Sequence, residues 1–239
     1  MQQEQQEKLL ILNTVFTPSA PITTKDLFFG RIFYVNKVID AIIEKGQHAV
    51  LYGERGVGKT SLANIINQIL DSNSINISKV TCNRTEDFGE IWIKALKRIF
   101  INLKSREGIG FIKQESHESF SIDKFLPTGK EVKPGDVINL LEQLQFNTLF
   151  IFDEFDNVGD SKIQAKFADT IKALSDSVPQ VTILVVGIAD SVNDLIGNHP
   201  SLERCLKQIK LPVMPDEELQ KIIDNGLEKL GMSVESDVR

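Results

Sequence analysis

Three glycines, a lysine and a threonine follow an apolar run at a spacing that suits a polyphosphate. The run HAVLY (48–52) leads into GERGVGKTS (53–61), which fits G-x-x-x-x-G-K-[ST] at every fixed position. The glycines allow backbone N–H groups to turn inward around phosphate oxygens. Lys59 is expected to bridge the β- and γ-phosphates, and the Thr60 hydroxyl to bind Mg²⁺. The loop residues expected to contact the phosphates are Gly53, Glu54, Arg55, Gly56, Val57, Gly58, Lys59, Thr60 and Ser61. A plain Gly-rich turn is the alternative, but it would not need the Lys-Thr pair.

A pair of acids at the end of a second apolar run supplies the other chemical signal. The segment TLFIFDEFD (148–156) places Asp153 and Glu154 at the carboxyl end of a predicted strand, the edge where open α/β sheets bind ligands. Asp153 is expected to hold Mg²⁺ opposite Thr60. Glu154 is expected to orient or deprotonate a water aimed at the γ-phosphate, which indicates hydrolysis. Two acids capping a strand in solvent are the alternative. Asp156 is expected to make a loop contact or cap a helix.

Apolar periodicity predicts the elements that must position these residues. Buried strands are predicted at 48–52, 148–156 and 181–187, because each is a short, nearly continuous apolar run, and two further strands are predicted at 75–82 and 207–212. Helical spacing recurs over 31–45, 62–70, 88–100, 136–144, 163–174, 190–197 and 219–230. Strands that alternate with helices and are apolar on both faces are typical of a parallel sheet covered on each side. The sequence therefore predicts a P-loop α/β fold, a three-layer α/β/α sandwich around a mostly parallel five-stranded sheet.

The same pass along the chain suggests three regions. Residues 1–25 are Gln-rich and then Pro/Thr-rich, and are expected to form a short helix and an extended arm. Residues 26–213 hold the predicted core. Within them, 104–135 are polar and turn-rich and are expected to be a loop insertion. Residues 214–239 are expected to be the start of a helical lid domain that is truncated here.

Composition narrows the class of protein. Hydrophobic residues make up 41% and charged residues 25%, which is ordinary for a globular domain, and the net charge of −6 argues against DNA binding across the whole surface. No run approaches the roughly 20 apolar residues of a membrane span, and the N-terminus does not read as a secretory signal. Cys82 and Cys205 have no metal-like spacing and are expected to be reduced thiols. We expect a cytoplasmic protein with no membrane partner.

Five segments together resemble a known group of proteins. They are LFFGR (27–31), GERGVGKTSLA (53–63), LFIFDEFD (149–156), VVGIADSVNDL (185–195) and HPSLERCLKQIKLPVMPDEELQKII (199–223). Over about residues 26–231 the chain resembles the AAA+ and STAND branch of P-loop ATPases, and more narrowly bacterial proteins related to replication-initiator ATPases. The chain has no guanine-reading N-K-x-D motif, which favours ATP over GTP.

The resemblance implies roles for further residues. Gly30 and Arg31 match the box where such proteins lodge the nucleotide base, although a simple chain turn is an equal alternative. Asp190, with its neighbour Ser191, falls where the family places a polar sensor of the γ-phosphate. Asparagine is usual at that position, so Ser191 is the alternative sensor.

Arg204 falls where related proteins carry an arginine that reaches into a neighbouring subunit's site. Such a group would stabilise charge on the transferring phosphoryl group, and would make self-association through the ATP sites part of the activity. A surface ion pair with Glu203 or Asp216 is the alternative.

The leading functional hypothesis is an ATP-binding and hydrolysing switch or motor core that uses ATP/ADP and Mg²⁺. A nucleotide-gated regulatory module with little hydrolysis is the first alternative. A DNA-loading ATPase like the initiators is the second, with DNA or a protein effector contacting regions outside this chain. A small-molecule kinase is least favoured, because no segment reads as a lid for an acceptor substrate.

Overall fold

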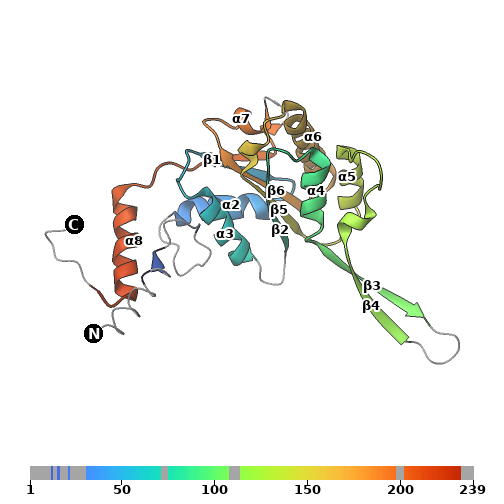
Figure 1. The fold of residues 1–239 in the computed structure, drawn as a ribbon, viewed down its shortest axis with the longest axis horizontal. Coiled ribbons are helices and arrows are strands. Elements are labelled where there is room, and N and C mark those ends of the chain that lie inside the picture. The colour runs from blue at the N-terminus through green and yellow to red at the C-terminus, as the bar shows by residue number, and fades with distance from the viewer. Residues whose placement is uncertain are drawn as a thin grey trace.

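Five parallel strands form the centre of the protein. The computed structural model describes residues 31–70, 75–107, 114–197 and 202–232, together with Leu12, Val15, Phe16 and Pro21. The strands are β1 (His48–Gly53), β2 (Asn76–Thr81), β5 (Thr148–Asp153), β6 (Val181–Ile188) and β7 (Leu206–Lys210), arranged in the order β2-β5-β6-β1-β7 (Figure 1). Because all of them are parallel, their carboxyl ends meet at one edge of the sheet.

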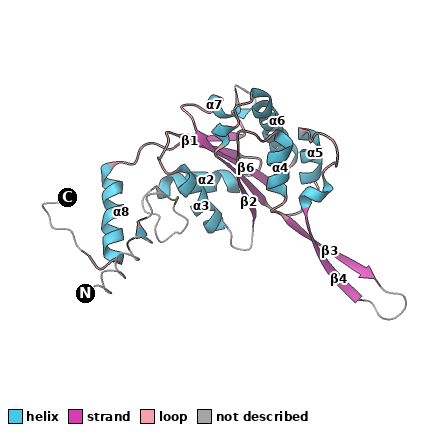
Figure 2. Ribbon diagram, in the orientation of Figure 1, coloured by secondary structure: helices cyan, strands magenta, loops and turns pink. Residues whose placement is uncertain are grey.

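Helices cover both faces of this sheet (Figure 2). One buried cluster joins the sheet to α2 (Ile32–Ile43) and α3 (Lys59–Leu70). The other joins it to α4 (Phe88–Leu96), α5 (Pro134–Leu141), α6 (Ser161–Ser177) and the short α7 (Asn193–Ile196). In β1, Ala49 and Leu51 belong to the first cluster and Val50 to the second. This alternation confirms the predicted α/β/α sandwich, and it explains why each central strand reads as a continuous apolar run.

A cluster of aromatic rings lies under the acid pair. Phe152 and Phe155 flank Asp153 and Glu154 in sequence, and both are fully buried. The Phe152 ring lies 5.1 Å from Trp92, and the Phe155 ring lies 4.8 Å from Phe167, each in an edge-to-face arrangement. Such pairs are favourable beyond their buried area. The strand end that carries the acids is therefore anchored on both sides.

The segment expected to be a loop contains a β-hairpin. Strands β3 (Phe100–Glu107) and β4 (Gln114–Ser121) pair antiparallel, with Phe100 opposite Ser121, and project from the core (Figure 1). The 3-10 helix η2 (Ile122–Phe125) follows. The helix expected over 88–100 ends at Leu96, where the chain turns. At the start of the hairpin, the Ile99 carbonyl accepts a hydrogen bond from the N–H of Ile122. The loop prediction was wrong for this part of 104–135, where the residues of the two strands pair with each other across the hairpin.

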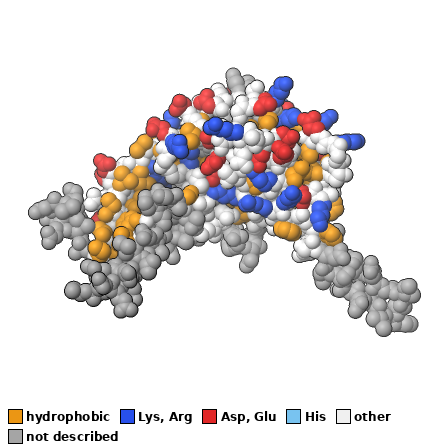
Figure 3. All heavy atoms as spheres, in the orientation of Figure 1, with side chains coloured by type: hydrophobic (Ala, Val, Ile, Leu, Met, Phe, Trp, Pro, Cys, Tyr) orange, Lys and Arg blue, Asp and Glu red, His pale blue; other side chains and the backbone are white. Residues whose placement is uncertain are grey.

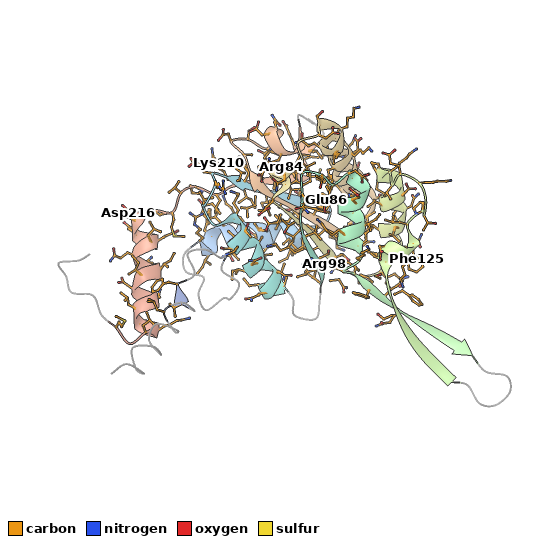
Figure 4. The ribbon with its side chains drawn as sticks, in the orientation of Figure 1. Arg84, Glu86, Arg98, Phe125, Lys210 and Asp216 are labelled. Carbon is orange, nitrogen blue, oxygen red and sulfur yellow. The ribbon has the colours of Figure 1, made fainter. Side chains whose placement is uncertain are left out.

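The C-terminal helix α8 (Asp216–Lys229) stands apart from the sheet. Lys210 and Asp216, labelled in Figure 4, mark the two ends of the linker that leads to it. Hydrophobic side chains gather over α8 in Figure 3. Gly226 lies directly against the ring of Phe16, where an added Cβ would be 2.2 Å from Cζ. Of the arm expected over 1–25, the structure describes Leu12, Val15, Phe16 and Pro21, and the other residues of the arm lie outside the described ones. No helix among the residues that the structure describes is long and apolar enough to cross a membrane.

Candidate functional site

The Gly-rich loop after β1 has the backbone that the motif requires. Gly56 and Gly58 have φ values of 82° and 92°, and a Cβ added at either would meet nothing within 4 Å. Their backbone is therefore open to a ligand, in a conformation that favours glycine. Gly53 is constrained differently, because an added Cβ would lie 2.4 Å from the Leu211 carbonyl oxygen. Helix α3 begins at Lys59, so its N-terminal N–H groups face the same loop.

Lys59 folds back over this loop. Its Nζ donates to the carbonyl oxygens of Gly53, at 3.0 Å, and Glu54, at 2.7 Å. Burial lowers the pKa of Lys59, and the nearby charges of Asp156 and Asp153 partly oppose that shift. The ammonium group therefore lies next to the cradle and within a cluster of opposite charge.

The carboxylate of Asp153 is buried and fully engaged. Its Oδ1 accepts from Thr60 Oγ1 at 3.2 Å and from the backbone N–H of Glu154 at 3.0 Å. Its Oδ2 pairs with Lys79 Nζ at 2.9 Å. The residues that the structure describes contain no cluster of three or more His, Cys, Asp or Glu side chains suited to a metal. A hydroxyl and a carboxylate oxygen 3.2 Å apart nevertheless fit Mg²⁺, which commonly takes one or two protein oxygens and completes its shell with phosphate and water.

Glu154 has an unusual backbone. Its φ of 55° and ψ of 39° place it in the left-handed region, which costs about 1–2 kcal/mol for a residue with a Cβ. Its Oε2 accepts from Asn157 Nδ2 at 3.3 Å, and the same amide donates to the Cys82 carbonyl at 3.2 Å. Such strain is retained where the surroundings impose it, often at functional sites. The turn directs Glu154 away from the path of β5 and toward Asn157.

The loop and the acids share one cavity of about 690 Å³. This volume lies within the usual range of small-molecule sites. The lining residues are Pro21, Arg55, Gly56, Gly58, Lys59, Thr60, Ser61, Arg84, Asp153, Glu154, Asp156, Asn157, Gly187 and Ile188. The sequence analysis missed Arg84 and Asn157, although each closely follows a strand that ends at this edge. Figure 4 labels Arg84 where the chain leaves β2. Asp156 makes the expected loop contact, since its Oδ1 accepts from the N–H of Ile188 at 2.8 Å.

The two proposed sensor residues lie beside this cavity rather than in its lining. Asp190 lines a neighbouring cavity with Glu54, and the two cavities share Arg55 and Ile188. Ser191 donates to Asp194 through both its hydroxyl, at 2.9 Å, and its N–H, at 2.8 Å. These bonds lower the pKa of Asp194. The Ser191 hydroxyl is therefore held by its own turn.

Arg31 lies at the base of the linker to α8. It is buried, donates from Nη2 to the Pro212 carbonyl at 2.7 Å, and lies 4.0 Å from Glu218. Burial lowers its pKa. It is not among the described residues that line the 690 Å³ cavity, and Gly30 lies outside the described residues.

Arg204, two residues before β7, forms a surface ion pair. Its partner is Asp176 of α6, at 2.5 Å, rather than Glu203 or Asp216 as the alternative had suggested. Both side chains are at least half exposed, at 66% and 50%, so the pair contributes little stability. Arg204 is therefore poorly held and accessible from outside the molecule.

Residues 21–239 match the sequence profile of a family described as Novel STAND NTPase 1, nSTAND1. The chain belongs to this family. Membership of nSTAND1 confirms the predicted relation to P-loop ATPases and supports nucleotide-binding ATPase function. The all-parallel sheet agrees with it.

Solved structures share the fold of this nSTAND1 chain. A Walker-type ATPase of Pyrococcus abyssi aligns with a TM-score of 0.61 and 17% identity, over 92% of this chain and 63% of that one. The Aeropyrum pernix ORC1 protein, in complex with DNA, aligns with a TM-score of 0.54 and 15% identity, over 91% and 53%. Among curated proteins, the ribose import ATP-binding protein RbsA of Lactococcus lactis is 33% identical over 111 residues, 44% of this chain and 20% of RbsA. The chain thus spans less than two thirds of each relative.

Proposed function

We propose that this protein binds ATP with Mg²⁺ and hydrolyses it, and that the cycle operates a molecular switch. The observation that carries the proposal is the convergence of four groups on one cavity. Thr60 and Asp153 lie 3.2 Å apart, Lys59 lies over the loop beside them, and Glu154 follows Asp153 directly. These are the groups that phosphoryl transfer requires for binding, charge compensation and water activation.

Binding would use the loop backbone first. The N–H groups around Gly56 and Gly58 would surround the phosphates, and Lys59 would exchange the carbonyls of Gly53 and Glu54 for phosphate oxygens. Thr60 and Asp153 would hold Mg²⁺. When bound, the ion neutralises charge on the β- and γ-phosphates.

Hydrolysis would depend on Glu154. Its carboxylate would orient a water and accept a proton as the water oxygen bonds to the γ-phosphorus. The bond from that phosphorus to the β–γ bridging oxygen breaks, releasing ADP and phosphate. Asn157 holds the carboxylate through its amide, and Arg84 adds a cation to the cavity wall.

The remaining candidate residues have secondary roles in the proposal. Asp190, which lines the neighbouring cavity, or its neighbour Ser191 would respond to the γ-phosphate. Gly30 and Arg31 would lie toward the base of the nucleotide. Arg204 would leave Asp176 and act on a second copy's nucleotide, which makes self-association part of the proposal. Turnover per molecule should then rise with protein concentration.

Calorimetry and phosphate release test this function. We expect the wild-type protein to bind ATP and release phosphate, and Glu154→Gln to bind ATP without release. Lys59→Met should bind weakly. Absence of heat when ATP is titrated into folded wild-type protein would overturn the nucleotide site. Equal inactivity of wild type and Glu154→Gln at every protein concentration would overturn hydrolysis by this chain.

A nucleotide-gated binding module is the second candidate. Both oxygens of Asp153 already have partners, and Asn157 already holds Glu154, so neither acid can take up its role in hydrolysis until these contacts change, which favours a site that binds nucleotide but hydrolyses it slowly. Purified protein that contains stoichiometric ADP and shows no ATP turnover would favour this second candidate. A DNA-loading role, suggested by the ORC1 likeness, would instead require salt-dependent DNA binding.

A further inference from the structure

A lysine projects from β2 into an apolar layer. In the parallel pair of β2 and β5, Lys79 lies opposite Ile151, and Thr81 lies opposite Asp153. Paired residues point to the same face of a sheet. Ile151 packs in the buried cluster beneath α2 and α3, so Lys79 and Asp153 emerge on that face as well. A charged side chain there requires a specific partner.

Two partners hold the Lys79 ammonium group. Nζ lies 2.9 Å from Asp153 Oδ2 and donates to Asn64 Oδ1 of α3. The side chain of Lys79 is 18% exposed and that of Asp153 is 3% exposed. The pair is therefore largely shielded from water and is screened much less by salt than a surface pair. Lys79 is also fixed at its backbone, because Arg98 donates to its carbonyl oxygen.

Because of this contact, the two oxygens of Asp153 have different partners. Oδ2 pairs with Lys79, while Oδ1 is left facing Thr60 Oγ1 and the N–H of Glu154. The carboxylate would approach a metal through Oδ1. A fixed positive charge on the opposite oxygen orients the carboxylate, and it also repels a second cation at the same carboxylate. Lys59, the other lysine near Asp153, bonds to loop carbonyls instead.

We propose that Lys79 is a positioning residue that sets the Mg²⁺ affinity of the site. It holds Asp153 with Oδ1 toward Thr60, and its charge weakens the attraction of Asp153 for Mg²⁺ by more than this orientation strengthens it. The proposal rests on the proposed ATP–Mg²⁺ site. Such a residue would make metal-dependent nucleotide binding respond to the Mg²⁺ concentration, because it keeps Asp153 from binding the metal at its full strength.

The test measures binding rather than turnover. Anisotropy of a fluorescent, non-hydrolysable ATP analogue would be recorded with the full chain, first in EDTA and then as free Mg²⁺ is raised. In Lys79→Met we expect the Mg²⁺ midpoint to fall about tenfold, the effect of removing one nearby charge. Affinity in EDTA should stay the same or weaken, because a cation near the phosphates has been lost. Lys79→Arg, which keeps the charge, should keep the wild-type midpoint.

Lys166→Met is the matched control, since Lys166 pairs with Glu131 at 2.6 Å on the other helical layer. It should leave the midpoint unchanged. A midpoint in Lys79→Met that equals or exceeds the wild-type value would overturn the proposal. If Lys79→Met does not fold, Lys79→Gln, whose amide can still bond to both partners, must show the fall in midpoint. Failure of the wild type to bind the analogue at any Mg²⁺ concentration would instead refute the proposed function.

Discussion

Replacing Glu154 by glycine should stabilise the protein relative to replacing it by alanine. Both changes remove the carboxylate and its contact with Asn157, so they differ only in the Cβ and its backbone preference. At most positions alanine is the more stable of the two, because glycine gains more freedom in the unfolded chain. At φ 55° and ψ 39° the order should reverse.

The size of the reversal follows from two opposing terms. The left-handed conformation costs a residue with a Cβ about 1–2 kcal/mol, and glycine avoids that cost. Against this, glycine is more flexible than alanine in the unfolded chain, which lowers the free energy of unfolding by about 0.5–1 kcal/mol. The net advantage of Glu154→Gly over Glu154→Ala is then about 1 kcal/mol, or a difference of about 2–4 °C in Tm for a domain of this size.

Thermal and urea unfolding of the two variants measure this difference. Ala165→Gly is the control, because Ala165 is exposed in the second turn of α6, where glycine should cost about 1 kcal/mol. Phosphate release should be lost in both Glu154 variants, so stability and activity should separate. If Glu154→Ala proves as stable as Glu154→Gly, the backbone at this position is not strained and the reasoning fails.

Three further predictions concern stability. Burial lowers the pKa of His48 to about 4, below its unfolded value of 6.5, so the unfolded state binds more protons between these pH values. Stability should be complete above pH 6.5 and fall by up to about 3 kcal/mol toward pH 4, a loss that urea titrations of His48→Gln should lack. Asp153→Asn should cost about 2–3 kcal/mol by leaving Lys79 without a counter-charge, and most of this should return in the double variant with Lys79→Met. Gly53→Ala should cost about 3 kcal/mol because its Cβ meets a carbonyl at 2.4 Å, whereas Gly56→Ala, with free space but a positive φ, should cost about 1 kcal/mol in the same melts.

The sequence predicts the three central strands well because β1, β5 and β6 are buried on both faces and therefore read as nearly continuous apolar runs. Each of the five predicted strands is present, and the Gly-rich loop and the acid pair meet in one cavity. Both motifs depend on local spacing, which a sequence displays directly. The β3–β4 hairpin was missed because its strands are polar and pair with each other, so no apolar pattern marks them.

Contacts between distant segments were not predictable in the same way. Lys79 is one of several polar residues in INISKVTC (75–82), so the sequence does not single it out. Its pairing with Asp153 depends on β2 lying beside β5. An ion pair was anticipated as an alternative for Arg204, but with Glu203 or Asp216, which lie within twelve residues of it in the sequence. The partner is Asp176, because α6 ends beside the turn that precedes β7.

The aromatic cluster beneath the acid pair contains a tryptophan whose fluorescence can report on the site. Trp92 is the single tryptophan of the chain, it is fully buried, and its indole N–H has no hydrogen-bond partner among the described groups. Its emission should therefore be blue-shifted. Since its ring lies 5.1 Å from Phe152, which directly precedes Asp153, any rearrangement of that strand end on nucleotide binding should alter the intensity or wavelength of this emission. Occupancy of the site can then be followed by intrinsic fluorescence, without attaching a dye.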